Sequence, residues 1–166
     1  MPELRTSQPA RDPDTTVKAT ALAYLIFERP DLDEAARFLC DFGLTVASRS
    51  ADALYLRGTA ATPYCYRIER VRKPRFVGFG LSVASRAALD ALSRLPGASP
   101  LRPAPHPGGG ERVVVMDPSG FTVEAIHGRS GADALPRRAP LCWNVGDVPR
   151  RINGTQRPPL GAPEVI

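Results

Sequence analysis

Very few side chains in this sequence combine a reactive type with a spacing that chemistry could use. His106 stands in the turn-prone segment Pro-Ala-Pro-His-Pro, and His127 follows Glu124 by three residues on an expected strand. Side chains alternate along a strand, so Glu124 and His127 face opposite sides and do not share a metal ion. We interpret His127 as a strand-end residue and His106 as a solvated loop histidine. Glu124 is left as the candidate acid, base or ligand.

Cysteine and serine chemistry has no signature here. Cys40, Cys65 and Cys142 are odd in number and widely spaced, without a Cys-x-x-Cys pair, so they indicate neither a disulfide framework nor a zinc site. No Gly-x-Ser-x-Gly elbow is present. The longest apolar run, residues 19–27, is too short to span a bilayer. We therefore expect a cytoplasmic protein without a membrane partner.

Two segments carry groups that bind phosphate in other proteins. Residues 108–110 are Gly-Gly-Gly without the Gly-Lys-Ser/Thr ending of a phosphate loop, so we expect a mobile hairpin loop. Residues 67–75 are densely basic, but Glu69 interrupts them, Pro74 ends them and no aromatic pattern accompanies them. We predict a solvated sheet edge or a subunit contact there, and no nucleic-acid partner.

The elements that must position these side chains fall into two similar halves. In the first half, a buried strand at residues 22–27 precedes a helix with Asp31 as N-cap and Glu34 as its capping-box partner. The helix ends at Gly43, because a residue without Cβ enters the left-handed conformation cheaply. Three strands follow, at about residues 44–48, 53–57 and 64–71.

The second half repeats this plan. A strand at residues 76–83 leads to N-cap Ser85, a helix through residue 95 and a stop at Pro96-Gly97. A shift that places Asp31 on Ser85 also places Gly43 on Gly97. Strands are expected at residues 99–102, 112–116 and 121–127, the last two joined by the type I turn Asp-Pro-Ser-Gly.

The pattern predicts an α+β fold of two βαβββ modules, residues 19–73 and 74–128, forming an open curved sheet shaped as a cup. Residues 1–18 lack apolar periodicity and are predicted to be a flexible N-terminal arm. Residues 129–166 are rich in Pro and Arg and read as a tail or interdomain linker. We expect the tail to pack through Leu141 and Trp143.

Residues 23–35 and 117–124 resemble the opening and closing strands of the vicinal oxygen chelate superfamily, which includes glyoxalases, bleomycin-resistance proteins and extradiol dioxygenases. The resemblance implies metal ligands on the first strand of each module and on the last strand of the second. Those positions hold Tyr24, Gly78 and Glu124 here. A metal site needs several donors, and only Glu124 is of a ligand type, so we predict no metal in this chain.

Further residues are expected to line the cup and to be available to a ligand. We predict that Tyr24 donates a hydrogen bond to Glu124, because a buried carboxylate without a partner is costly. The predicted cup-lining residues are Tyr24, Ile26, Gly78, Thr122, Glu124 and Ile126.

Within the superfamily, the chain is most similar to the N-terminal domain of a two-domain extradiol (catechol 2,3-) dioxygenase. That domain commonly has Tyr in the first position and no iron. The resemblance implies a whole protein that cleaves a catechol ring with Fe(II) in a second domain, in the catabolism of aromatic compounds. This chain would hold no cofactor and no catalytic residue, and would serve structure and assembly. Its partners would be a C-terminal catalytic domain or further copies of itself.

Two alternatives remain open at this point. One is a stand-alone small-molecule binding protein of the glyoxalase and bleomycin-resistance type, a homodimer with a small aromatic ligand in the cup. The other is an isomerase or lyase with Glu124 as general base.

Overall fold

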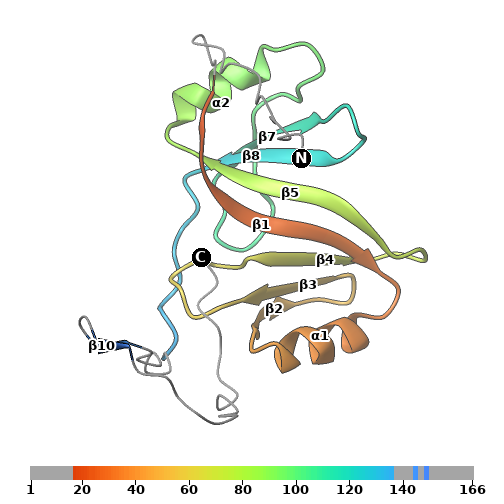
Figure 1. Ribbon diagram of the computed structural model, residues 1–166. Helices are drawn as coiled ribbons and strands as arrows, with labels where there is room; N and C mark the ends of the chain where they lie inside the picture. Colours follow the sequence, from red (N-terminus) through yellow and green to blue (C-terminus); the bar gives the residue numbers. More distant parts are fainter. Residues whose placement is uncertain (1–16, 137–143, 146–147, 150–166) are drawn as a thin grey trace, which may run out of the picture.

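The computed structural model describes residues 17–136, 144–145 and 148–149, and Figure 1 shows its elements. The first module contains β1 (Ala19–Arg29), α1 (Leu32–Asp41), β2 (Thr45–Arg49), β3 (Ala53–Arg57) and β4 (Tyr66–Arg70). The second module contains β5 (Arg75–Val83), α2 (Arg86–Ser93), β6 (Arg102–Pro103), β7 (Glu111–Met116) and β8 (Thr122–His127). A separate two-stranded sheet consists of β9 (Asn144–Val145) and β10 (Val148–Pro149).

The strands of both modules form one eight-stranded sheet in the order β2-β3-β4-β1-β5-β8-β7-β6. In each module the last strand runs parallel to the first, β4 beside β1 and β8 beside β5. The modules join through the antiparallel pair β1 and β5 in the middle of the sheet (Figure 1). The α+β fold with an open curved sheet is therefore confirmed.

The N-caps and the glycine stops expected at the helix ends are present. The Asp31 carboxylate accepts hydrogen bonds from the backbone N–H groups of Asp33 and Glu34, and the Ser85 side chain accepts one from Ala88. Both helix stops are left-handed glycines, since Gly43 has a φ of 92° and Gly97 a φ of 81°.

One strand lies later in the chain than its sequence pattern indicated. The segment expected at residues 99–102 pairs as β6 only from Arg102 to Pro103. Ser99 instead forms two hydrogen bonds with Val114 on β7: its N–H donates to the Val114 carbonyl, and its hydroxyl accepts from the Val114 N–H. The Ser99 side chain thus takes the place of a ladder hydrogen bond.

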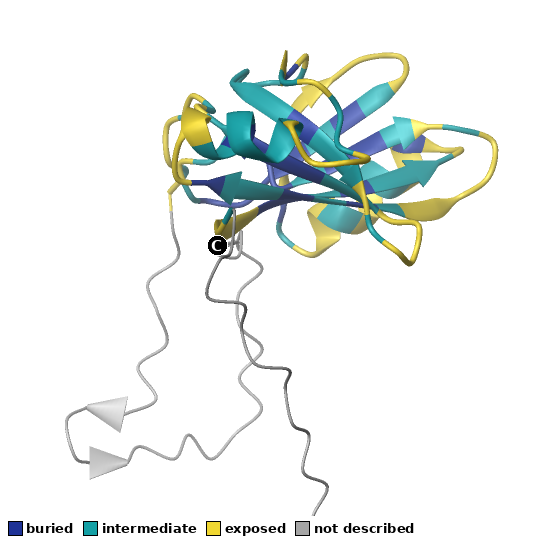
Figure 2. Cartoon of the chain, turned by 90° about the horizontal axis from the view of Figure 1, so that it is seen from above, coloured by how far each residue is buried: buried dark blue, intermediate teal, exposed yellow. Residues whose placement is uncertain are grey.

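Side chains alternate between the two faces of the sheet, and both faces bury apolar residues. On the outer face α1 packs on Leu54, Leu56 and Ile68, and α2 packs on Val113 and Ala125. The inner face buries a third cluster, and Figure 2 shows that buried residues follow the strands while exposed residues gather at loops and helix surfaces. The members of the inner cluster are Ala23, Tyr24, Ile26, Tyr64, Ala104 and Ile126.

The chain after β8 continues along the first module. The N–H of Ala132 donates to the Ala61 carbonyl and that of Leu135 to the Thr59 carbonyl, so residues 129–135 lie beside the connection from β3 to β4. The N-terminal arm up to residue 16, the predicted docking residues Leu141 and Trp143, and residues 150–166 lie outside the described residues. No helix in the described part of the chain has the length and hydropathy needed to cross a membrane.

Candidate functional site

A row of three residues crosses the two modules at the inner face. Tyr24 on β1 pairs in register with Gly80 on β5, and Gly80 pairs with Glu124 on β8. A Cβ on Gly80 would lie 2.4 Å from Tyr24 Cζ, so the tyrosine ring occupies the space that a side chain on β5 would fill. Tyr24 Oη reaches across and donates to Glu124 Oε2 at 2.6 Å, which confirms the predicted hydrogen bond.

Gly78, the glycine chosen from the sequence repeat, has a different surrounding. A Cβ on Gly78 would lie 1.8 Å from the backbone oxygen of Thr122, so a side chain here would collide with the backbone of β8 and not with Tyr24. Gly78 has a φ of 152° and pairs in register with Thr122 at the start of β8. Gly80 is the glycine that lets the two modules share a hydrogen bond.

Glu124 is held by two arginines as well as by Tyr24. Arg67 on β4 donates through Nη2 to Oε1 at 2.9 Å and through Nη1 to Oε2 at 3.2 Å, and Arg112 on β7 donates through Nη1 to Oε1 at 2.8 Å. Glu124 is 2% exposed and Arg67 5%. Burial alone would raise the pKa of Glu124, but the hydrogen bonds and charge of Arg67, with the bonds from Tyr24 and Arg112, lower it to about 2.

His106 belongs to this cluster, so its interpretation as a solvated loop histidine was wrong. Its Nε2 lies 2.6 Å from Arg67 Nη1 and 3.4 Å from Arg112 Nη1, and its Nδ1 lies 3.0 Å from Tyr55 Oη. A guanidinium only donates, so Nε2 accepts and the proton lies on Nδ1. Burial, followed by the charges of Arg67 and Arg112, lowers the pKa of His106 to about 4, and the imidazole is neutral at pH 7.

The Gly-Gly-Gly turn holds His106 in this place. The Gly109 N–H donates to the His106 carbonyl at 3.0 Å, and the Ala104 N–H donates to the Gly110 carbonyl at 2.8 Å. The Ser130 N–H then ties the turn to the chain after β8 through the Gly108 carbonyl. The turn thus seats the imidazole against the inner face of the first module.

Arg129 completes the filling of the cup. Its guanidinium carbon lies 4.3 Å from the ring centroid of Tyr64 and 5.0 Å from that of Tyr24. Its Nη2 donates to the Tyr64 carbonyl at 3.0 Å, and burial lowers the pKa of Arg129. Within residues 17–136 no carboxylate pairs with Arg129, so aromatic faces and backbone carbonyls carry its charge.

The predicted cup residues are partly brought together. Tyr24 and Glu124 are bonded, and Ile26 and Ile126 are each 1% exposed in the same inner cluster. Thr122 is half-buried at the sheet margin beside Gly78. His127 places Nδ1 3.0 Å from the Val83 carbonyl at the end of β8.

Sequence reasoning missed Gly80, Arg67, Arg112 and His106. For Arg67 a signal existed in the alternation of the strand, where Arg67 points to the face opposite Tyr66 and Ile68. This strand lies beside the first strand of its module rather than at the edge of the sheet, so both of its faces are covered. The predicted solvated edge is wrong at this residue.

The donor set at this cluster does not fit the metal ion that the resemblance associates with the cup. Two guanidinium groups occupy the carboxylate oxygens of Glu124 and would repel a cation. Burial and the charge of Glu124 raise the pKa of Tyr24, which keeps the phenol protonated, and Arg67 occupies the accepting nitrogen of His106. Across residues 17–136 no three His, Cys, Asp or Glu side chains gather as metal ligands would.

Comparison with solved structures shows the same fold. The Mn(II)-bound glyoxalase from Novosphingobium aromaticivorans matches with a TM-score of 0.67 and 21% identity, over 76% of this chain and 44% of that one. Homoprotocatechuate 2,3-dioxygenase from Arthrobacter globiformis matches with a TM-score of 0.63 and 22% identity, over 70% and 38%. A variant of this enzyme from B. fuscum matches with a TM-score of 0.64 and 18% identity, over 72% and 35%.

No family model and no curated protein matches the sequence. The chain spans less than half the length of each of these three structures. The likeness confirms the predicted fold, which this chain shares with a glyoxalase and with extradiol ring-cleaving dioxygenases.

Proposed function

We propose that this chain, with its vicinal oxygen chelate fold, is a metal-free and non-catalytic domain of an extradiol dioxygenase-like protein. Its role is structural and serves assembly. Ring cleavage of a catechol with Fe(II), in the catabolism of aromatic compounds, belongs to a second domain. The likeness to dioxygenases more than twice as long as the matched part supports this proposal.

The proposal rests on one observation: both carboxylate oxygens of Glu124 already accept hydrogen bonds from other side chains. Tyr24 and Arg67 come from the first module, and Arg112 and Glu124 come from the second, so the cluster clamps the modules together across β1 and β5. A buried charge network of this kind is stable only when every member is paired. Drawing any member out to serve a reaction would leave another charge unpaired.

The alternative functions in the cup are less well supported. A carboxylate with a pKa of about 2 that accepts bonds from three residues is a poor general base near neutral pH. A ligand in the cup would have to displace side chains such as Tyr24 and Ile26, each 1% exposed.

With a structural role, the proposed partners are a C-terminal catalytic domain or further copies of the chain. The unpaired thiols of Cys40 and Cys65 support a location in the reducing cytoplasm.

Anaerobic equilibrium dialysis against Fe(II) or Mn(II), with metal per chain measured by mass spectrometry, tests the proposal. We expect well below one metal ion per chain, with the same value for Glu124→Gln. Incubation of the chain with catechol, Fe(II) and oxygen should give no ring-cleaved product. One metal ion per chain that is lost in Glu124→Gln, or cleavage of catechol by this chain, would overturn the proposal.

A further inference from the structure

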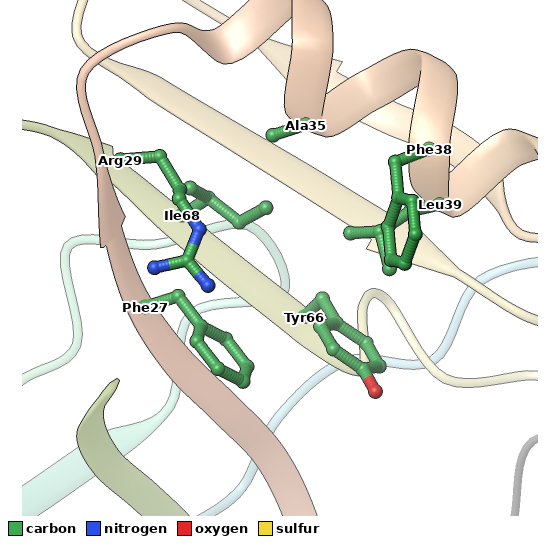
Figure 3. A pocket seen from close by; sticks show the side chains of 7 residues that line it. All are labelled: Phe27, Arg29, Ala35, Phe38, Leu39, Tyr66 and Ile68. Atoms are coloured by element: carbon green, nitrogen blue, oxygen red, sulfur yellow. The ribbon is translucent and has the colours of Figure 1, made fainter. Parts of the chain in front are cut away.

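A cavity lies on the opposite face of the sheet from Glu124, between α1 and the strands β1 and β4. Its volume is about 210 Å³, and Figure 3 shows seven side chains around it. Three of them project from α1 and four from the two strands. They are Ala35, Phe38 and Leu39 on α1, Phe27 and Arg29 on β1, and Tyr66 and Ile68 on β4.

The walls of this cavity are flat and apolar. The rings of Phe27 and Tyr66 are nearly parallel, 7° apart with centroids at 5.8 Å, and Phe38 hangs from α1 above Tyr66 (Figure 3). Phe38 is 60% exposed, so its ring can move aside at little cost. An apolar cavity of about 150 Å³ is enough to bind benzene, and drug-sized ligands need about 300 Å³ or more. The cavity therefore suits a single ring with one small substituent.

The charged group that lines the cavity is Arg29, which has no carboxylate partner among the described residues. Arg29 donates from Nη1 to the backbone carbonyl of Glu28, and its guanidinium lies 5.4 Å from the ring of Phe27. In residues 17–136 no acidic side chain forms an ion pair with Arg29. The neighbouring carboxylates are engaged elsewhere, Glu28 by Arg75 and Asp31 by the amides that it caps.

A second arginine adds to the positive charge at this end of the cavity. Arg70 is the register partner of Arg29 on the parallel strand β4, so both side chains leave the same face of the sheet. Arg70 is exposed and likewise forms no ion pair within the described range. An anion at the mouth of the cavity would be attracted by both arginines, although Arg70 also interacts electrostatically with Asp31.

We propose that this cavity binds a small aromatic monocarboxylate. The ring lies among Phe27, Tyr66 and Phe38, and the carboxylate accepts hydrogen bonds from the Arg29 guanidinium. The cavity belongs to the first module alone and shares no residue with the Glu124 cluster. The proposal therefore stands or falls independently of the proposed function.

Titration of the ¹⁵N-labelled chain with benzoate, followed by amide NMR shifts, tests this proposal. We expect shifts confined to the segments that line the cavity and weak, saturable binding. Benzamide has the same ring without the charge and should bind about tenfold more weakly or worse, because charge-assisted hydrogen bonds to Arg29 are lost. Equal affinity for benzamide would contradict the assignment of a carboxylate.

Matched variants separate the site from overall charge. Arg29→Gln should weaken benzoate about tenfold, whereas Arg102→Gln, the same change on exposed β6 of the other module, should leave the affinity within about twofold. Ala35→Leu fills the cavity from α1 with a good helix former and should also abolish saturable binding. The amide spectrum of each variant reports whether it is folded.

Three results would overturn the proposal. These are no shift at the cavity residues with benzoate, unchanged affinity in folded Arg29→Gln, or self-association that protects the cavity residues in sedimentation and NMR. The last result would assign the cavity to a second copy of the chain.

Discussion

Arg67 and Arg29 lie on neighbouring strands of one module, and their surroundings differ completely. Arg67 faces the inner side, is 5% exposed and is bonded to Glu124 and His106. Arg29 faces the helix side beside a cavity and bonds only to a backbone carbonyl. We call the inner face closed, because its charged groups are bonded to one another, and the outer face open, because Arg29 lies there without a carboxylate partner beside a cavity.

The ion cluster on the closed face can favour one arrangement of the modules, but the fold then depends on every member of the cluster. A buried ion cluster contributes little net stability when complete, but it destabilises strongly when one member is removed. Because the Glu124 cluster spans both modules, it favours one arrangement of the two halves over others. On the outer face the exposed Phe38 at the cavity carries no such constraint and can be changed without unfolding the chain.

The largest effect is expected from breaking the closed face at its centre. Glu124→Gln leaves Arg112 without a charged partner in the described residues and leaves Arg67 with only Glu69, whose side chain is 43% exposed, so it should lower the free energy of unfolding by about 3–5 kcal/mol. Urea denaturation at pH 7 measures this loss. Glu111→Gln, which breaks the exposed pair with Arg86, is the control and should cost no more than about 1 kcal/mol. Equal losses in the two variants would refute the contrast between the faces.

Gly80→Ala should have the next largest effect. Its Cβ would lie 2.4 Å from Tyr24 Cζ, so the ring must move and its bond to Glu124 must lengthen. We expect a loss of about 2–4 kcal/mol from overpacking and the weakened hydrogen bond, although alanine is normally better than glycine in a strand. The same substitution in a Tyr24→Leu background should cost much less. A cost that persists there would show that Tyr24 is not what requires Gly80.

The closed face should also give the protein an acid-sensitive stability. The folded pKa of His106, about 4, lies below its ordinary 6.5, so the unfolded chain binds this proton first. Stability is then complete above about pH 6.5 and falls by roughly 1–3 kcal/mol towards pH 4. The lowered pKa of Glu124 extends the loss from its ordinary 4.5 down to about 2. Denaturation at pH 7 and pH 5 should show a smaller decline in His106→Gln, and an identical decline would remove His106 as the cause.

The smallest effect on stability is expected on the open face. Phe38→Gln removes an apolar ring that is 60% exposed and should change the free energy of unfolding by less than about 0.5 kcal/mol. The same variant should still weaken benzoate measurably, because Phe38 forms one wall of the cavity. Thermal denaturation and the NMR titration measure the two effects on one sample. A large loss of stability would mean that Phe38 belongs to the core.

Much of the fold was predictable because its signals are local. Asp31, Ser85, Gly43 and Gly97 mark the ends of both helices through cap and left-handed geometry that depends on a few neighbouring residues. Strand alternation placed Tyr24 and Glu124 on one face. The resemblance to the vicinal oxygen chelate superfamily then placed both residues on the floor of the cup, so their hydrogen bond could be expected although they are 100 positions apart in the chain.

The sequence by itself determined the elements of the two modules and their caps, because backbone preferences and side-chain alternation act over a few residues; the meeting of Tyr24 with Glu124 followed from the resemblance to a known superfamily. Only the tertiary structure decided that Arg67 and His106 are buried, that Gly80 rather than Gly78 clears the path, and that Arg29 stays unpaired in the described chain. The reason is electrostatic. Arg67 is buried where a carboxylate 57 positions away meets it, and that meeting depends on strand order and register across the whole sheet.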